Sequence, residues 1–199
     1  QKKVGGENPA SQIVTEIDLK AQKVILEFLT PTLKRYDLAL LAEESIDDGS
    51  RFIKDYFWCI DPLDGTLAFT KEEQGYSVSI ALVDKDGNSI IGVVYDPIGK
   101  NLYHAMKDHP AYRNDSIFKK AKDRNVLTHL YDQSFLKHEL YENELNKLNE
   151  LAKKLNLLGV QPHPLGGAVL NAIYTIEMAP AIYYKHPKKG QGGGSIWDF

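Results

Sequence analysis

The sequence predicts an α/β fold, an α+β sandwich in which sheets and helices form layers. Residues 76–106 contain three strand-like runs separated by turn residues, which is typical of an antiparallel meander. Residues 126–184 alternate strand and helix patterns, as in a layered α/β unit. We expect an N-terminal α+β domain over residues 1–122 and a partial C-terminal α/β domain over residues 123–199.

The composition excludes several classes of protein. A net charge of −3 gives no overall basic field for a nucleic acid polymer. The single cysteine, Cys59, rules out an internal disulfide framework and fits a reducing, cytoplasmic compartment. No apolar run reaches the ~18 residues of a membrane span. Because the chain begins at Gln1 and stops abruptly at Phe199, we expect it to be truncated at both ends.

The first regular element should be a helix. Residues 1–11 are polar and glycine-rich, which predicts a loop. A helix is expected over about residues 15–33, because apolar residues follow the spacing of one buried face: Val14, Ile17, Ala21, Val24, Ile25 and Phe28. Asp18 falls on the same stripe, where a buried carboxylate needs a partner. Alternatively, Asp18 only favours the dipole of the first helical turn.

Two buried strands end in acids. Residues 38–42 run into Glu43, and the apolar run 56–60 runs into Asp61, Pro62, Leu63, Asp64, Gly65 and Thr66. Pro62 should end the strand and force a turn in which Asp61 and Asp64 meet beside the Leu63 carbonyl. Such an oxygen set suits Mg²⁺, and amides opening a helix at Gly65 and Thr66 suit a phosphate. A turn with solvated acids is the alternative.

The remaining elements follow in order. A short helix or loop after Thr66 leads to strands over residues 76–83, 88–95 and 102–106, the first two joined by a turn at Asp86-Gly87. Residues 108–122 should be irregular. We then expect a strand at 126–131, a helix at 136–155, a rigid connector at 161–164, a helix at 166–178, a strand at 181–184 and a loop at 187–194.

Five acids at element ends or on the helix stripe are the candidates for chemistry: Asp18, Glu43, Asp61, Asp64 and Asp198. Together they could hold two or three divalent ions. Sites with two metal ions clamp the attacking and leaving oxygens of an in-line displacement. Hydrolysis of a phosphate monoester fits that arrangement.

Residues 58–66 resemble the first signature of the inositol monophosphatase superfamily. These proteins are Mg²⁺-dependent, Li⁺-sensitive phosphatases and include the 3'(2'),5'-bisphosphate nucleotidases. Residues 42–45, 13–18 and 196–198 resemble further elements of the family, in the same order along the chain. The resemblance implies a layered αβαβα fold and hydrolysis of a small phosphate monoester by direct attack of a metal-activated water. It also implies a homodimer, since family members are often dimeric.

The resemblance also implies roles for single residues. The magnesium ligands would be Glu43, Asp61, the Leu63 carbonyl, Asp64 and Asp198, while Asp18 and Thr66 would orient and deprotonate the attacking water. The amides of Gly65 and Thr66 would hold the phosphate, and the backbone of Gly166, Gly167 and Ala168 would line the substrate.

One departure from the family concerns the substrate. Lys185 stands where inositol monophosphatases have a glutamate that contacts an inositol hydroxyl, and Lys188 and Lys189 follow it. Lysines suit a second phosphate, so a bisphosphate nucleotide is favoured over an inositol phosphate. The alternative is an ordinary solvated loop. The sequence does not choose among inositol phosphates, bisphosphate nucleotides and sugar bisphosphates.

Two alternatives to this function are considered. An apolar strand runs into Asp84, Lys85 and Asp86, the layout of the nucleophile loop in haloacid-dehalogenase-type phosphatases. The Asp86-Gly87 pair between alternating strands is, however, a strong hairpin signal. The second alternative is a non-catalytic metal- or phosphate-binding relative, because the chain ends directly after Asp198.

Overall fold

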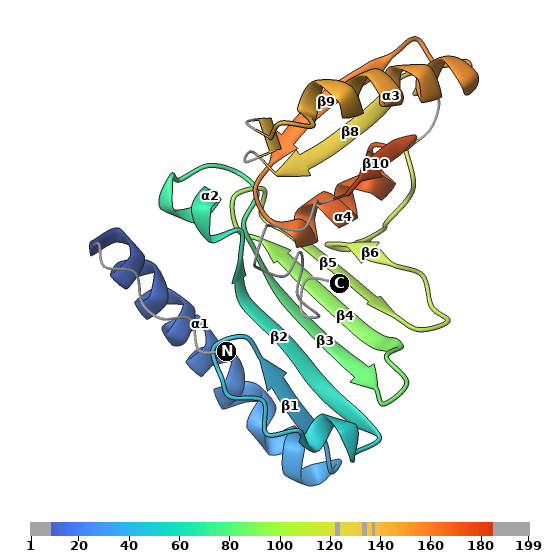
Figure 1. Cartoon of the computed structure of the whole chain (residues 1–199). Coiled ribbons are helices and arrows are strands. Elements are labelled where there is room, and N and C mark those ends of the chain that lie inside the picture. The colour runs from blue at the N-terminus through green and yellow to red at the C-terminus, as the bar shows by residue number, and fades with distance from the viewer. Residues whose placement is uncertain (1–8, 122–123, 133–134, 137, 185–199) are drawn as a thin grey trace.

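The computed structural model describes residues 9–121, 124–132, 135–136 and 138–184. Within these residues there are two sheets, one of seven strands and one of three (Figure 1). The larger sheet has the order β1 (Ala39–Ala42), β2 (Tyr56–Asp64), β3 (Ser77–Asp84), β4 (Ser89–Asp96), β5 (Asn101–Met106), β6 (Tyr112–Arg113) and β7 (Ser116–Ile117). The smaller has the order β10 (Ala181–Tyr183), β8 (Leu127–Asp132) and β9 (Val160–Leu165).

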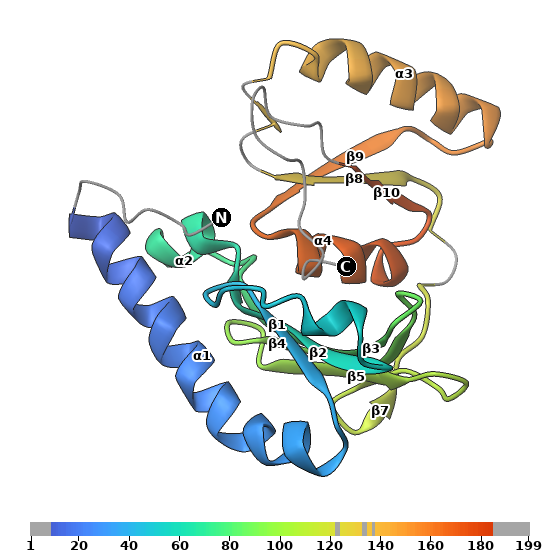
Figure 2. The same cartoon turned by 60° about the horizontal axis from the view of Figure 1, so that its bottom comes forward.

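Helices and sheets alternate as layers (Figure 2). The helices are α1 (Pro9–Arg35), α2 (Thr66–Thr70), α3 (Tyr141–Lys154) and α4 (Ala168–Glu177), with a short 3₁₀ turn, η1, at Ser50–Phe52. The outer layers are α1 and α3, and α4 lies between the two sheets. The predicted layered α/β fold is therefore confirmed. The expected domain boundary at residues 122 and 123 falls outside the described residues, so it stays a prediction.

Helix α1 differs from the prediction in its bounds. It begins at Pro9, so the expected loop over residues 1–11 is too long, and it ends at Arg35 rather than at residue 33. Proline is well tolerated at a helix start, where its missing N–H would have had no partner within the helix. The extra turns lengthen the helix along the edge of the larger sheet that contains β1 and β2 (Figure 1).

The buried face of α1 was predicted only in part: Asp18 is buried and Ile17, Ala21 and Ile25 are half-buried, but two expected apolar residues are not. Phe28 is 78% exposed and Val24 is 55% exposed, whereas Asp18 and Gln22 are buried. The Gln22 amide donates to Ser45 Oγ at 2.9 Å and accepts the backbone N–H of Glu44 at 3.1 Å. These bonds to the segment after β1 rotate the helix so that polar residues face inward. The apolar spacing alone cannot show that rotation.

Strand β2 continues through the residues expected to form a turn. It runs to Asp64, and its pairing with β3 shifts register between Asp61 and Asp64. Such an irregularity leaves a residue outside the ladder, which is where proline is tolerated in an inner strand. Pro62 therefore bends the strand without ending it, and the predicted turn at this position is wrong.

The antiparallel meander is confirmed, because β3 pairs with β4 and β4 with β5. The segment expected to be irregular instead carries the short β6–β7 hairpin. Asn114, in the left-handed region with φ 52°, turns the chain there. Its side-chain oxygen accepts the backbone N–H of Leu102 at 2.8 Å, which holds the hairpin against β5.

The three strands of the smaller sheet are parallel. The expected connector at residues 161–164 is wrong, because these residues lie in β9. This strand is at the edge of the sheet, where Pro162 and Pro164 cost no ladder bond if their nitrogens point away from β8. Helix α3 starts at Tyr141, later than residue 136, and α4 is two residues shorter at its start than the interval 166–178.

Three apolar clusters hold the layers together. Cys59, buried as expected, packs with Ala39, Leu41, Phe57 and Val83. The second cluster joins α4 to both sheets, through Tyr103 of β5 and Leu165 of β9, and residues of α3 and the smaller sheet form the third. Among the described residues, no helix is both long and apolar enough to cross a membrane. The packing places the start of α4 against the end of β2.

Candidate active site

Parallel pairing of β1 and β2 brings the first two acids together. Ala42 lies beside Ile60, and the backbone N–H of Glu43 donates to the Ile60 carbonyl at 3.1 Å. Glu43 and Asp61 therefore leave the same edge of the sheet. Asp61 is only 3% exposed. Burial raises the pKa of Asp61 far above its usual range, and the adjacent Glu43 carboxylate raises it further.

A side-chain hydrogen bond joins Glu43 and Asp61. Two carboxyl groups can bond in this way only if a proton lies between them. Asp61 Oδ1 also accepts the backbone N–H of Leu63 at 2.9 Å, which fixes the carboxyl group above the bend in β2. The pair is thus a buried acidic centre that needs a proton or a cation to be stable.

Asp64 takes a different direction. Its two carboxylate oxygens accept the backbone N–H groups of Ala168, at 3.1 Å, and Val169, at 2.9 Å. These amides form the first turn of α4, where a negative charge is favoured by the helix dipole. Asp64 therefore connects β2 to the helix between the sheets. The negative charge of Asp64 also raises the pKa of Asp61, because the two carboxylates repel each other.

Four glycines allow the backbones to approach at this junction. Gly65 has φ 84°, and a Cβ there would overlap the Gly75 carbonyl and come within 2.9 Å of the Gly167 nitrogen. A Cβ on Gly75 would overlap Gly166, and one on Gly167 would overlap the Asp64 carboxylate. Sequence reasoning missed Gly75. Its only sequence signal is an isolated glycine directly before a strand pattern.

Thr66 lies beside Leu63. Thr66 begins α2, and its hydroxyl donates to the Leu63 carbonyl at 3.3 Å. The backbone N–H groups of Ala68 and Phe69 donate to the Gly65 carbonyl, which closes the turn. Whether the amides of Gly65 and Thr66 hold a phosphate stays a prediction.

Asp18 is buried on α1, which packs against β2 and α2. It lies one helical turn before Gln22, whose side chain bonds the backbone of Glu44. Residues four apart share a helix face and lie about 6 Å apart along it. Asp18 thus faces the part of the molecule that carries Glu43 and Asp61.

Four of the five predicted acids lie in the described residues, and the structure does not place these four around one point. Within the described ranges, no group of three or more histidine, cysteine, aspartate or glutamate side chains could hold one metal ion. Glu43 and Asp61 meet, whereas Asp64 points to α4. Asp198 and Lys185 lie outside the described residues, as do Lys188 and Lys189. Gly166, Gly167 and Ala168 do lie at the junction, where two successive amides of the α4 start bind Asp64.

Asp84 has a structural role in the β3–β4 hairpin. Its carboxylate accepts the backbone N–H of Asp86 at 3.0 Å and of Asn88 at 2.8 Å. The Asn88 side chain adds a further bond, and these bonds lower the pKa of Asp84. In the β2–β3 ladder Asp84 pairs with Tyr56, and Ser77 pairs with Asp64. Asp84 and Asp64 therefore lie at opposite ends of the strand pair, roughly 20 Å apart at ~3.3 Å per residue.

This fold and site define a layered α/β protein with a buried acidic centre where its two sheets meet. Comparison with known proteins identifies the particular family. The chain belongs to the inositol monophosphatase family, whose model matches residues 1–199.

Relatives of the chain support this assignment. It is 39% identical to a 3'(2'),5'-bisphosphate nucleotidase, CysQ, of Salmonella typhimurium, over 93% of this chain and 69% of that protein. It is 30% identical to an inositol-1-monophosphatase of Bacillus subtilis, over 58% of this chain and 42% of that protein. The crystal structure of CysQ from Bacteroides thetaiotaomicron superposes with a TM-score of 0.66 at 26% identity, covering 83% of this chain and 64% of that one. The chain thus spans about two fifths to two thirds of these relatives.

Proposed function

We propose that the chain is the core of a magnesium-dependent phosphomonoesterase that acts on a small phosphate ester. The observation that carries the proposal is the contact between the half-buried Glu43 and the buried Asp61, whose pKa is raised by burial and by the Glu43 carboxylate. A divalent cation could balance both charges. Carboxylate and carbonyl oxygens, which are the donors present here, are the ligands that Mg²⁺ prefers.

Under this proposal two or three magnesium ions are held by side chains of both parts of the chain. The ligands would be Glu43, Asp61, the Leu63 carbonyl, Asp64 and, from beyond the described residues, Asp198. When bound, the ions supply charge neutralisation for the phosphate and an ionised water at neutral pH. Thr66 and Asp18 would direct a water at phosphorus, and no phosphorylated enzyme would form. By family resemblance Li⁺ should inhibit the reaction.

The residues of the chain itself would orient the reactants. Thr66 and Asp18 would position the attacking water and accept its proton. The Thr66 hydroxyl already lies at the Leu63 carbonyl, one of the proposed ligands. The amides of Gly65 and Thr66 would hold the phosphate.

The backbone at the start of α4 contacts Asp64 and is also proposed to line the substrate. Its amides at Ala168 and Val169 bind Asp64 here. Each carboxylate oxygen has two lone pairs, so Asp64 can keep these bonds and still offer an oxygen to a metal ion. In that arrangement Gly166 and Gly167, rather than Ala168, would face the substrate.

For the substrate we propose a 3'(2'),5'-bisphosphate nucleotide. A relative that is 39% identical over 93% of this chain is named for that activity. Lys185 and the lysines after it would bind the second phosphate. Inositol phosphates are the second candidate, since other relatives carry that name. A homodimer is a further proposal drawn from the family.

The test is phosphate release from adenosine 3',5'-bisphosphate, inositol 1-phosphate and fructose 1,6-bisphosphate, with Mg²⁺ and with chelator. We expect turnover only with Mg²⁺, highest kcat/KM on the nucleotide, and loss of turnover by at least 100-fold in Asp61→Asn. Asp84→Asn is the matched control and should keep turnover. Loss of turnover in Asp84→Asn alone would favour the dehalogenase-type mechanism, and tight Mg²⁺ binding without turnover would favour a non-catalytic relative.

A further inference from the structure

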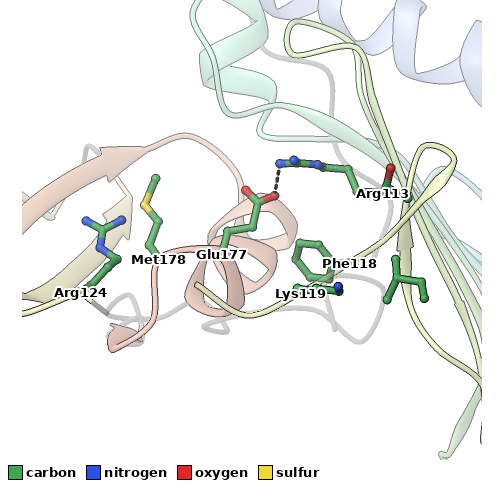
Figure 3. Close-up of a pocket in the computed structure, with 8 residues that line it drawn as sticks. Arg113, Phe118, Lys119, Arg124, Glu177 and Met178 are labelled. Atoms are coloured by element: carbon green, nitrogen blue, oxygen red, sulfur yellow. Dashed lines mark hydrogen bonds and ion pairs between the residues drawn. The ribbon is translucent and has the colours of Figure 1, made fainter. Parts of the chain in front are cut away.

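A pocket of about 400 Å³ lies at the end of α4, away from Asp64. It is bounded by the β6–β7 hairpin, the residues after β7 and the last turn of α4 (Figure 3). Because α4 has 10 residues, its two ends are roughly 15 Å apart. The pocket is therefore separate from the junction that carries the acidic pair. Its volume falls in the range of roughly 300–1,000 Å³ that small-molecule sites occupy.

The charged residues of the pocket are mostly cationic. Arg113, Lys119 and Arg124 line it, with Glu177 as the one acid among its lining residues. Arg113 donates to Glu177 at 2.7 Å, so these two charges balance each other. Arg124 donates to the neutral side-chain oxygen of Gln161 at 3.1 Å, which leaves its charge uncompensated.

Within the described part of the chain, no ion pair joins Lys119 or Arg124 to an acid. The lining side chains thus sum to a charge of +2, in a chain whose net charge is −3. A concave surface with this excess of positive charge raises the local concentration of anions. The excess distinguishes the pocket from the rest of an acidic protein.

Apolar side chains interrupt the mostly polar lining of the pocket. Phe118 and Met178 line it between the cations (Figure 3). The Phe118 ring is fixed by an edge-to-face contact with Tyr103, with the ring centres 5.5 Å apart. A rigid aromatic wall and a thioether favour a flat apolar body. A ring that carries one negative group matches both features of the pocket.

We propose that this pocket binds a small aromatic anion. The ring lies against Phe118 and Met178, between Lys119 and Arg124, whose positive charges attract the anionic group. The site is independent of the proposed phosphatase centre, since none of its lining residues belongs to that centre.

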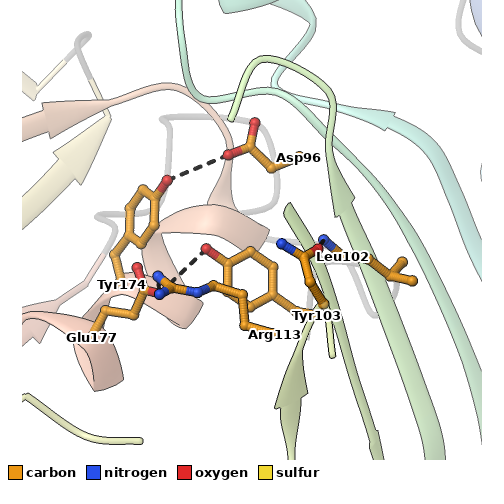
Figure 4. A network of polar contacts seen from close by, with 7 residues as sticks. Asp96, Leu102, Tyr103, Arg113, Tyr174 and Glu177 are labelled. Carbon is orange, nitrogen blue, oxygen red and sulfur yellow. Dashed lines mark hydrogen bonds and ion pairs between the residues drawn. The ribbon is translucent and has the colours of Figure 1, made fainter. Parts of the chain in front are cut away.

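The last turn of α4 forms one side of the pocket. The helix is fastened to the larger sheet by Glu177 with Arg113 and by Tyr174, whose hydroxyl donates to Asp96 at 3.5 Å (Figure 4). These contacts fix the last turn of α4, and with it the side of the pocket that Glu177 and Met178 form.

The experiment is an amide NMR titration with benzenesulfonate, which a phosphatase cannot hydrolyse, at fixed ionic strength and pH 7. We expect saturable shifts at residues 113–119 and 177–178, and at least tenfold weaker binding in the double variant Lys119→Gln, Arg124→Gln. Lys23→Gln, an exposed lysine of α1, is the matched charge control and should bind as the wild type does. The unperturbed spectra of the variants report whether they are folded.

Three results would overturn the proposal. Shifts that do not saturate would mean no site. Equal binding of neutral benzenesulfonamide would mean that the pocket does not recognise charge. Shifts centred on Gly65, Thr66 and Ala168 would assign the anion to the junction instead. The Mg²⁺ dependence of phosphate release is measured separately, so failure here leaves the proposed function untouched.

Discussion

The substitution Gly167→Ala probes the junction between β2 and α4 directly. Gly167 has φ −74° and ψ 166°, which alanine adopts without strain. The added methyl group, however, would overlap the Asp64 carboxylate. Backbone conformation is thus unaffected, and the steric conflict with Asp64 is the only expected cause of a change.

The size of the effect follows from the two bonds that Asp64 makes. Overpacking typically costs about 1–3 kcal/mol, and a hydrogen bond to a charged group contributes about 1.5–3 kcal/mol. If Asp64 gives up one amide to make room, the free energy of unfolding should fall by about 2–4 kcal/mol. Gly92→Ala in β4 is the matched control, because its methyl group would meet no atom within 4 Å. That variant should stay within ~1 kcal/mol of the wild type.

Urea unfolding followed by fluorescence measures both variants. The same pair of glycine substitutions is then made in an Asp64→Ala background, where the carboxylate is absent. We expect the cost of Gly167→Ala to drop by more than ~1 kcal/mol in that background, and the cost of Gly92→Ala to stay the same. The reasoning is refuted if Gly167→Ala costs no more than Gly92→Ala, or if it costs the same with and without the carboxylate.

Three further outcomes are expected. His129 is fully buried among aromatic rings, and this burial lowers its pKa to about 4, so unfolded chains bind more protons below pH 6.5. Stability should therefore fall by about 1–2 kcal/mol from pH 7 to pH 5, and His129→Phe should remove most of that loss in urea unfolding at the two pH values. Because the pKa of Asp61 is raised, the metal-free protein should lose stability as the pH rises from 4 to 8, and Asp61→Asn should raise the Tm of the chelator-treated protein at pH 8. An unchanged or lower Tm would contradict the conclusion that repulsion between the Glu43 and Asp61 carboxylates destabilises the metal-free protein. Asp84→Asn keeps a side-chain oxygen that can accept the hairpin N–H groups, so it should leave both the fold and Mg²⁺-dependent turnover intact, which paired unfolding and turnover assays would show.

The meeting of Glu43 and Asp61 could be predicted from the chain because each of these acids lies at the end of a strand pattern. Glu43 and Asp61 follow apolar runs, and strands that pair in parallel bring such ends together. That β1 and β2 pair in parallel is a tertiary fact, yet it agrees with the prediction that both acids face one place. The layered fold followed from the meander and from the later alternation of elements.

The errors have physical causes that a single sequence hides. The rotation of α1 is set by the bonds of Gln22 to residues 22 and 23 positions away, against the apolar pattern. Pro62, Pro162 and Pro164 were taken as breaks, but a register shift and a sheet edge remove the need for their N–H groups. The contact of Asp64 with the start of α4 spans more than 100 residues, so no local pattern could reveal it.

The central claim is that the oxygens at the end of β2 and after β1 bind a divalent ion. Paramagnetic broadening of amide NMR signals by Mn²⁺, which prefers the same oxygen ligands as Mg²⁺, tests it without requiring turnover. We expect broadening to begin at Glu43 and at residues 61–66, to be competed by Mg²⁺, and to be lost in Asp61→Asn. Broadening that begins elsewhere, or that persists in Asp61→Asn, would contradict the claim.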